Sequence, residues 1–212
     1  IGDNVAGAAY LSQDIPEGQQ SDTLDAIKDG KTEISDNTSG GANPTAWSNW
    51  SNSVQHGDND AEITFRYDTQ QRIGQITVYF ARDNSSMTFP DAGTTKIYIS
   101  ETGEEGSWTQ LNAKETIAES ESSNRVKPYT YTFDPATATY VKLYVKNAES
   151  REGGGTPCTG ITEVVINGWT GSYTTNSGAA FTSMKVNGLD VSADDLEAGA
   201  FDTEAVIIDS LE

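Results

Sequence analysis

The sequence predicts an all-β protein, an antiparallel β-sandwich or jelly roll. Short segments rich in β-branched and aromatic residues follow one another and are separated by clusters of Gly, Pro, Asn, Asp and Ser, which is typical of strands joined by turns. Helical periodicity is nearly absent, so no helix is expected to connect parallel strands. Seven or eight strands at this spacing therefore favour two packed antiparallel sheets.

The strand signals come in a clear order along the chain. Residues 1–23 are expected to form an N-terminal segment with one short strand around residues 5–11. Clear strands are then expected at residues 61–68, 71–82, 94–101, 107–112, 129–135, 139–147 and 159–169. Turn residues bound each of these segments, as they usually bound strands.

Two of the segments indicate which face of the sheet is buried. In both, apolar residues alternate with Thr, Tyr or Lys, and alternate residues of a strand point to opposite faces. The residues expected to face the core are Ile76, Val78, Phe80, Val141, Leu143 and Val145.

The last part of the chain differs from the rest. Residues 171–180 are rich in small residues, which is typical of a linker, and strand signals follow at residues 184–186 and 205–208. About forty residues are too few to close a sandwich alone. We therefore expect one domain at residues 1–170, with residues 171–212 forming a linker and a short C-terminal β extension or the start of another module.

Charge and composition exclude several classes of partner. The chain has 32 acidic and 13 basic side chains and a net charge of −19, which repels nucleic acids and anionic membrane surfaces. No apolar run is long enough for membrane insertion. One cysteine, Cys158, and one histidine preclude an intramolecular disulfide and make zinc unexpected, whereas oxygen ligands for a hard cation are plentiful.

No catalytic site stands out in the sequence. Carboxylates are numerous enough for a glycosidase pair, but no pair is set apart from the others. The motifs of serine hydrolases, zinc peptidases and phosphate-binding loops are absent. We therefore expect a binding module and not an enzyme.

Several weak motifs occur in a specific order. Asp29-Gly30 is followed by a Ser/Asn/Asp-rich loop, Trp47-Ser48-Asn49-Trp50, VYFARDNSSMTFPDAGTTKIYIS, GSWTQL, YTFDPATATYVKLYV and GITEVVINGW. Over residues 5–169 this series resembles the discoidin-like superfamily, the coagulation factor V/VIII type C jelly roll. The resemblance is to the form appended to bacterial extracellular glycoside hydrolases such as large multimodular β-galactosidases.

The resemblance implies a discoidin-like jelly roll of eight strands that binds carbohydrate. It implies a monomer within a larger chain, extracellular and either secreted or attached to the cell wall, that targets a parent glycoside hydrolase to galactose-type glycans. The tail resembles the start of an immunoglobulin-like module. The alternative is a structural or adhesive spacer of the same fold without a sugar site.

The resemblance also implies a structural calcium ion, which takes about six to eight oxygen ligands. The implied ligands are the carboxylates of Asp29 and Glu163 and the carbonyls of Ala26, Lys31 and Thr162. Because the loop after Gly30 is longer than in the shortest form of the pattern, Thr32, Asp36 or neither completes the shell. Alternatively, Asp29 only caps a turn with Gly30.

Candidate sugar contacts lie in three loops, because sugars stack on aromatic rings and hydrogen-bond to planar polar side chains. Trp47 is expected in the core, whereas Trp50 is either a core residue or a stacking platform. For the other candidates the alternatives are a solvated histidine and a surface ion pair between neighbouring Arg and Asp side chains. The candidates are Trp50, His56, Arg82, Asp83, Asn84 and Arg151.

Overall fold

The computed structural model describes residues 2–15, 23–36, 44–50, 60–119, 125–150, 157–170, 183–186 and 189–192. The chain divides into two compact units, Ile1–Ser172 and Tyr173–Glu212. In the second unit, β11 (Ser183–Val186) pairs antiparallel with β12 (Leu189–Ser192). The strand expected at residues 205–208 lies outside the described residues.

Strands make up almost all of the regular secondary structure in the described part of the first unit, which confirms the predicted antiparallel β-sandwich. The helices in this described part are two short 3₁₀ helices, η1 and η2. Neither is long and apolar enough to cross a membrane. The elements are β1 (Asp3–Asn4), η1 (Ala6–Ala8), β2 (Tyr10–Gln13), η2 (Leu24–Lys28), β3 (Trp47–Ser48), β4 (Ala61–Ala81), β5 (Met87–Thr88), β6 (Lys96–Ser100), β7 (Thr109–Gln110), β8 (Lys114–Ile117), β9 (Val126–Val145) and β10 (Cys158–Thr170).

Two long strands, β4 and β9, run through both layers of the sandwich. Residues 61–66 of β4 pair with β2 and with residues 140–145 of β9, which in turn pair with β6. Together with β7, these segments form the first layer.

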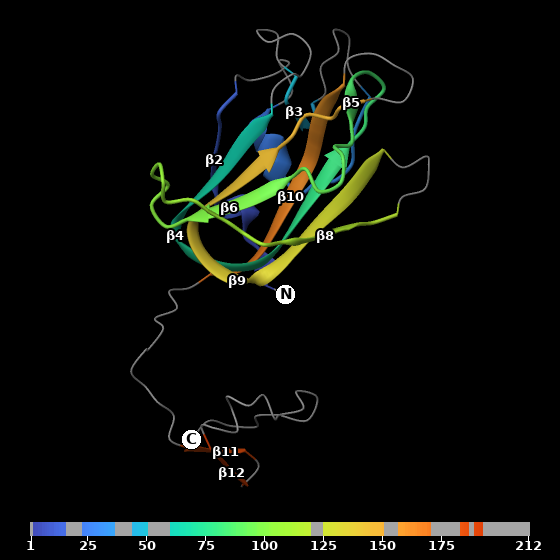
Figure 1. Cartoon of the computed structure of the whole chain (residues 1–212). Coiled ribbons are helices and arrows are strands. Elements are labelled where there is room, and N and C mark those ends of the chain that lie inside the picture. Colours follow the sequence, from blue (N-terminus) through green and yellow to red (C-terminus); the bar gives the residue numbers. More distant parts are fainter. Residues whose placement is uncertain are drawn as a thin grey trace. The chain divides into compact units, whose positions relative to one another are not determined.

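The remaining halves of β4 and β9 form the second layer. Residues 75–81 of β4 pair with β10 and with residues 126–132 of β9, while β8 extends this layer beyond β9. Figure 1 shows β4 and β9 curving at the same end of the molecule. The register between them shifts there, and such bulges bend strands. One continuous sheet therefore folds over to make both layers.

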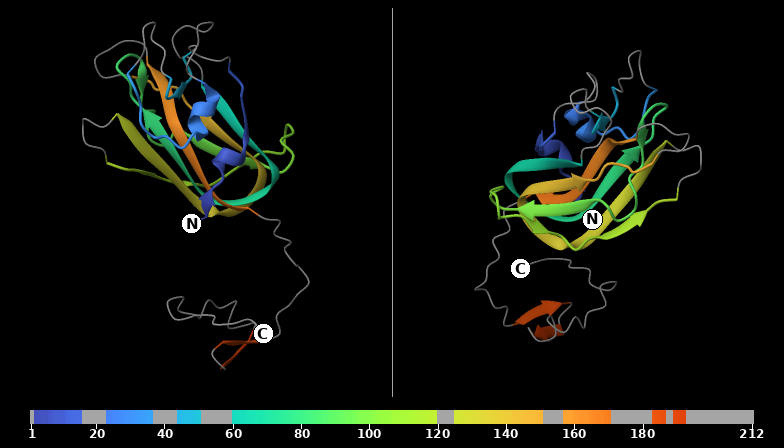
Figure 2. Two further views of the ribbon diagram at one scale, coloured as in Figure 1. Left: turned by 180° about the vertical axis from the view of Figure 1, so that it is seen from behind. Right: turned by 45° about the horizontal axis from the view of Figure 1, so that its top comes forward.

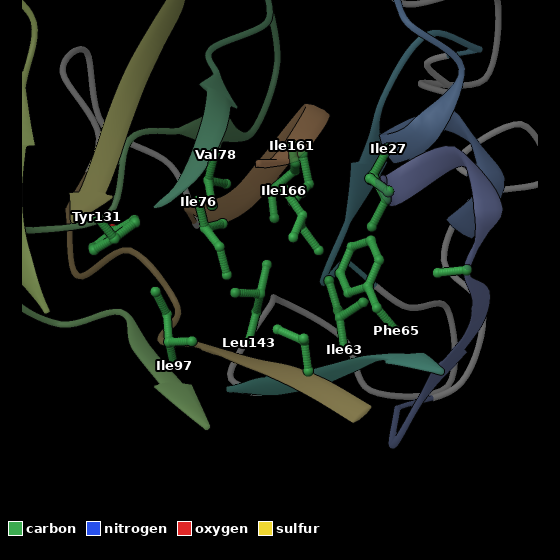
Figure 3. Packing of buried hydrophobic residues seen from close by; sticks show 14 of the residues in the cluster. Ile27, Ile63, Phe65, Ile76, Val78, Ile97, Tyr131, Leu143, Ile161 and Ile166 are labelled. Atoms are coloured by element: carbon green, nitrogen blue, oxygen red, sulfur yellow. The ribbon is translucent and has the colours of Figure 1, made fainter. Parts of the chain in front are cut away.

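The core lies between the two layers, where the alternating pattern predicted it. All six residues expected to face the core are fully buried. Figure 3 shows Ile76 and Val78 of the second layer pointing toward Leu143 and Ile63 of the first. Burial of such side chains is worth about 25 cal/mol per Å² of apolar surface, so this interior is the main source of stability.

Two pairs of expected strands are each one continuous strand. Residues 61–68 and 71–82 both belong to β4, and residues 129–135 and 139–147 both belong to β9. The turn-forming residues between them lie at the corner of the sandwich. There residues 133–135 lack ladder partners in β4, so Pro135 is tolerated without its backbone donor.

The N-terminal segment also differs from the prediction of a strand at residues 5–11. The amide N–H of Val5 donates to the carbonyl of Ile166 (2.8 Å), and Asn4 Oδ1 accepts from the amide of Ala6 (3.0 Å). These contacts turn the chain into η1, and the strand begins only at Tyr10. Figure 2 shows η1 and η2 lying against β10.

Candidate functional site

One end of the sandwich is built from the loops that carry most of the candidate residues. We call it the loop end and define it by residues 29–36, 44–50, 82–89 and 125–126. At this end β3 and β5 pair with the beginning of β10. The loop end lies opposite the corner at which β4 and β9 bend (Figure 1).

Trp47 is part of the core, as predicted. Its side chain is 1% exposed, and its residue pairs with Ile161 of β10. The indole Nε1 donates a hydrogen bond to Gln13 Oε1 at 2.6 Å. This bond satisfies the polar group of a buried indole, so Trp47 fixes the loop end to the sandwich and is closed to ligand.

Trp50 has a different environment, because it is half-buried. It packs against a small apolar cluster of Ala46, Met87 and Cys158 that is separate from the main core. Met87 begins β5 directly after residues 82–86, so Trp50 lies next to the end of the segment that holds the other described candidates. Trp50 also remains partly accessible to solvent.

Asn49 holds the backbone next to Trp50 in place. Its side chain is fully buried; Oδ1 accepts from the amide of Thr159 (2.8 Å) and Nδ2 donates to Asn147 Oδ1 (2.7 Å). The amide of Asn49 donates to the carbonyl of Thr159 (3.1 Å). Trp50 is therefore positioned by a rigid neighbour even though it lies at a loop.

Arg82, Asp83 and Asn84 do not present their side chains as one set. Asp83 is 7% exposed, and its Oδ1 accepts from the amides of Ser85 (2.8 Å) and Met87 (2.9 Å). Asp83 thus shapes its own loop. Arg82 is half-buried and Asn84 is exposed, so these two offer polar atoms to a ligand more readily.

Arg125 is a residue of the loop end that the sequence analysis did not select. Its Nη1 donates to Asp36 Oδ1 (2.6 Å), Nη2 to the carbonyl of Ser35 (3.0 Å) and Nε to the carbonyl of Arg82 (3.2 Å). An open groove of about 420 Å³ runs beside Arg125, between Ile34 and Tyr79. No local pattern marked Arg125, because its partners are distant in sequence.

Two of the predicted sugar contacts, His56 and Arg151, lie outside the described residues. Their place relative to Trp50 therefore stays a prediction.

Two of the expected calcium ligands, Asp29 and Glu163, lie close to Gly30. Glu163 of β10 is 2% exposed, and its Oε2 accepts from the amide of Gly30 at 3.0 Å. Its Oε1 is buried without a hydrogen-bond partner among the described residues. Burial raises the pKa of Glu163 to about 7; the bond from Gly30 opposes this shift and the charge of Asp29 adds to it.

The residues present fit a calcium ion. The unpartnered oxygen of Glu163 lies near the carboxylate of Asp29, and a hard cation prefers such oxygens. No group of three His, Cys, Asp or Glu side chains that could hold a metal occurs in the described part of the chain. Backbone carbonyls, including those of Ala26, Lys31 and Thr162, would therefore supply much of the shell.

Asp29 also caps the turn at Gly30, which is the alternative role that the sequence suggested for it. Its Oδ1 accepts from the amide of Lys31 (2.9 Å), which closes a turn at Gly30 (φ +81°), and its Oδ2 lies 3.2 Å from Lys31 Nζ. The two possible additional ligands have partners already: the Thr32 carbonyl accepts from Thr162 Oγ1 (3.0 Å), and Asp36 binds Arg125.

The family model of the F5/8 type C domain matches residues 18–164. The chain belongs to this family. This confirms the discoidin-like fold expected from the order of motifs. No curated protein matches the chain.

Solved structures show the same fold at low sequence identity. The family 32 carbohydrate-binding module of Clostridium perfringens NanJ, in complex with galactose, is 18% identical over 78% of this chain and 98% of that chain, with a TM-score of 0.50. A structure of the Streptococcus pneumoniae β-galactosidase BgaA is 11% identical over 77% of this chain and 99% of that chain, with a TM-score of 0.52.

Proposed function

We propose that this F5/8 type C domain is a non-catalytic carbohydrate-binding module that targets a parent glycoside hydrolase to galactose-type glycans. The observation that carries the proposal is the half-buried Trp50, which follows the fixed Asn49 and packs against the cluster of Met87, the residue that ends the loop of Arg82 and Asn84. An aromatic side chain beside Arg and Asn is the combination that sugar rings and hydroxyls require. The galactose complex of the NanJ module supports this choice of ligand.

The proposed mechanism is recognition followed by retention. The exposed part of Trp50 stacks on an apolar face of the sugar, while Arg82 and Asn84 hydrogen-bond to its hydroxyls. Binding to one site of a glycan raises the effective concentration of a linked enzyme near that glycan. The module needs no chemical step to increase the rate at which its parent enzyme acts.

Calcium is proposed as a structural ion. Asp29 and Glu163 would hold it with the carbonyls of Ala26, Lys31 and Thr162, and the ion would supply positive charge beside the buried Glu163 carboxylate. Because Asp29 follows η2 and Glu163 lies in β10, the ion would join the first loop of the domain to its last strand.

Location and assembly are proposed to follow from this role. The chain acts as a monomeric module of a larger extracellular protein, secreted or attached to the cell wall. Residues 171–212 serve as a linker and as a β extension or the start of an immunoglobulin-like module.

Isothermal titration calorimetry against galactose, lactose, N-acetyllactosamine and arabinose in the presence of calcium tests the proposed function. We expect saturable binding of at least one galactose-containing sugar. Trp50→Ala is expected to weaken it at least tenfold, which corresponds to about 1.4 kcal/mol. Trp108→Ala is the matched control, because Trp108 lies beside Tyr140 and Lys142 of β9, away from the loop end.

Two outcomes would contradict the proposal. Absence of heat from all four sugars would favour the structural or adhesive spacer. Binding that Trp50→Ala leaves unchanged would move the sugar away from the loop end.

A further inference from the structure

Lys127 is a half-buried cation that binds no carboxylate in the described part of the chain. It is the second residue of β9 and directly follows the loop-end residues 125–126. Its side-chain partner among the described residues is the ring of Phe89, whose centroid lies 5.3 Å from Lys127 Nζ. The ammonium is therefore partly removed from water without an anion beside it.

The surroundings of Lys127 are unusual in so acidic a chain, which has 32 acidic and 13 basic side chains. Lys96 and Lys114 also lack an ion pair within the described residues, but both are exposed, so water compensates their charge. Burial of a charge costs free energy unless the charge is paired, so an anion beside Lys127 would be favourable. Other described cations do lie within 4 Å of a carboxylate, and they are Lys28, Lys31, Arg66, Arg125, Lys142 and Lys146.

Arg82 brings a second positive charge to the same ring, because its Cζ lies 6.0 Å from the centroid of Phe89. In the ladder Lys127 pairs with Phe80. The amide of Arg82 donates to the carbonyl of Arg125 (2.7 Å), so the pairing continues past the end of β4. Arg82 is two residues beyond Phe80, and alternate residues point to the same face. Arg82 and Lys127 are therefore diagonal neighbours on one face.

Two carboxylates of the loop end have other partners. Asp36 binds Arg125, and Asp83 accepts from two amides of its own loop. The ring between Arg82 and Lys127 compensates positive charge only weakly, since an aromatic face carries no net charge. Two like charges beside one ring also repel each other. An anionic group bound between them would relieve this repulsion.

Phe89 connects the two cations to the proposed sugar site. It directly follows β5, which lies at the loop end (Figure 1). β5 begins at Met87, a member of the cluster against which Trp50 packs. Phe89 and Trp50 are both half-buried. Arg82 and Phe89 thus belong to the segment that ends beside the proposed stacking platform.

We propose that the loop end selects galactose-type sugars that carry an acidic group, and that Lys127 and Arg82 bind this group beside the ring of Phe89. The inference rests on the proposed carbohydrate-binding function and specifies its class of ligand. A carboxylate or a sulfate ester accepts charge-assisted hydrogen bonds, which are stronger than those between neutral groups. It also supplies the negative charge beside Lys127, which the hydroxyls of a neutral sugar do not.

Isothermal titration calorimetry of the full chain with galactose, galacturonate and galactose 6-sulfate tests the inference. The three sugars share one ring and differ at C6, which carries a hydroxyl, a carboxylate or a sulfate ester. The calcium concentration is kept constant, and salt at about 150 mM screens charges of the chain farther than about 8 Å from the ligand. We expect at least one acidic sugar to bind at least about fivefold more tightly than galactose.

The outcomes separate this inference from the proposed function. Binding of galactose with equal or weaker binding of both acidic sugars would overturn the inference and leave the proposed function standing. Tighter binding of galacturonate or of galactose 6-sulfate would support the inference and identify the acidic group. Binding of the acidic sugars alone would support the inference and show that neutral galactose is not the ligand. Absence of binding by all three sugars would overturn both.

Three variants assign the preference to Lys127. Lys127→Gln removes the charge, and we expect it to reduce the ratio of the two affinities, acidic sugar over galactose, to about one. Lys127→Arg retains the charge and should keep most of the ratio. Lys114→Gln is the matched control, because Lys114 is exposed and pairs with Thr132, farther along β9. An unchanged ratio in Lys127→Gln, or an equal loss in Lys127→Arg, would overturn the inference.

Discussion

Glu163 is nearly inaccessible to solvent, and its raised pKa makes the stability of the domain depend on pH. The pKa rises from 4.5 to about 7 on folding, so between these values the folded state binds more protons than the unfolded state. Stability must therefore fall as pH rises through this window. The proposed calcium ion would require the ionised carboxylate, so its binding would oppose this fall in stability.

Urea denaturation across pH 4.5–7 checks this dependence. With a chelator present, we expect the free energy of unfolding to fall with rising pH by at most about 3 kcal/mol. Excess calcium should remove the fall. In Glu163→Gln the contribution of this residue should be absent under both conditions. A flat profile with the chelator would show that Glu163 ionises normally in the fold.

Individual residues also show which side-chain roles can be predicted from the sequence and which cannot. The burial of Trp47 followed from its position near the Asp29-Gly30 pair, because the order of motifs marked it. The inward role of Asp83 could not be predicted, since it depends on the amides of Ser85 and Met87 turning toward its carboxylate. The sequence analysis therefore gave Arg82, Asp83 and Asn84 the same role as sugar contacts, whereas in the structure Asp83 holds its own loop.

At the scale of elements, Arg125 joins the segment of residues 31–36 to the ends of β4 and β9. It donates three hydrogen bonds to that segment and to Arg82. Because about a third of its side chain is exposed, solvent weakens the ion pair with Asp36. The bonds to the two carbonyls are the larger part of its effect.

We expect Arg125→Ala to lower the free energy of unfolding by about 1–2 kcal/mol. Arg125→Lys should recover only part of this loss, because an ammonium cannot reproduce the planar set of donors. Chemical denaturation provides the measurement, with the exposed Lys114→Ala as a control. Equal stability of Arg125→Ala and the wild type would show that segment 31–36 is held by other contacts.

The strands themselves were predictable where one face is buried. Alternation identified the core faces of β4 and β9, since a buried face requires an apolar residue at every second position. The corners were not predictable, because turn-forming residues such as Pro135 occur both in hairpin loops and in bulges. Short strands such as β8 give too few residues for alternation to be seen, so β8 was not predicted.

For the whole molecule, the division at residue 172 implies that the first unit carries its own stability. Each layer and the core between them consist of residues from this unit. We expect a chain that ends at residue 172 to keep the Tm of the full chain within about 2 °C and to bind sugar equally well. A large fall in Tm on truncation would show that the tail contributes to the sandwich.

The place of β10 within the sheet determines when the protein can fold during synthesis. β10 is the last strand of the sandwich in the sequence, and it pairs with β1, which is the first strand, on one side and with β4 on the other. At roughly 5–20 residues per second, a ribosome needs on the order of 5–20 s to pass from the end of β4 to the end of β10. During that time the backbone of β4 has an unpaired edge, so the nascent chain depends on chaperones or on its strong negative charge to avoid association.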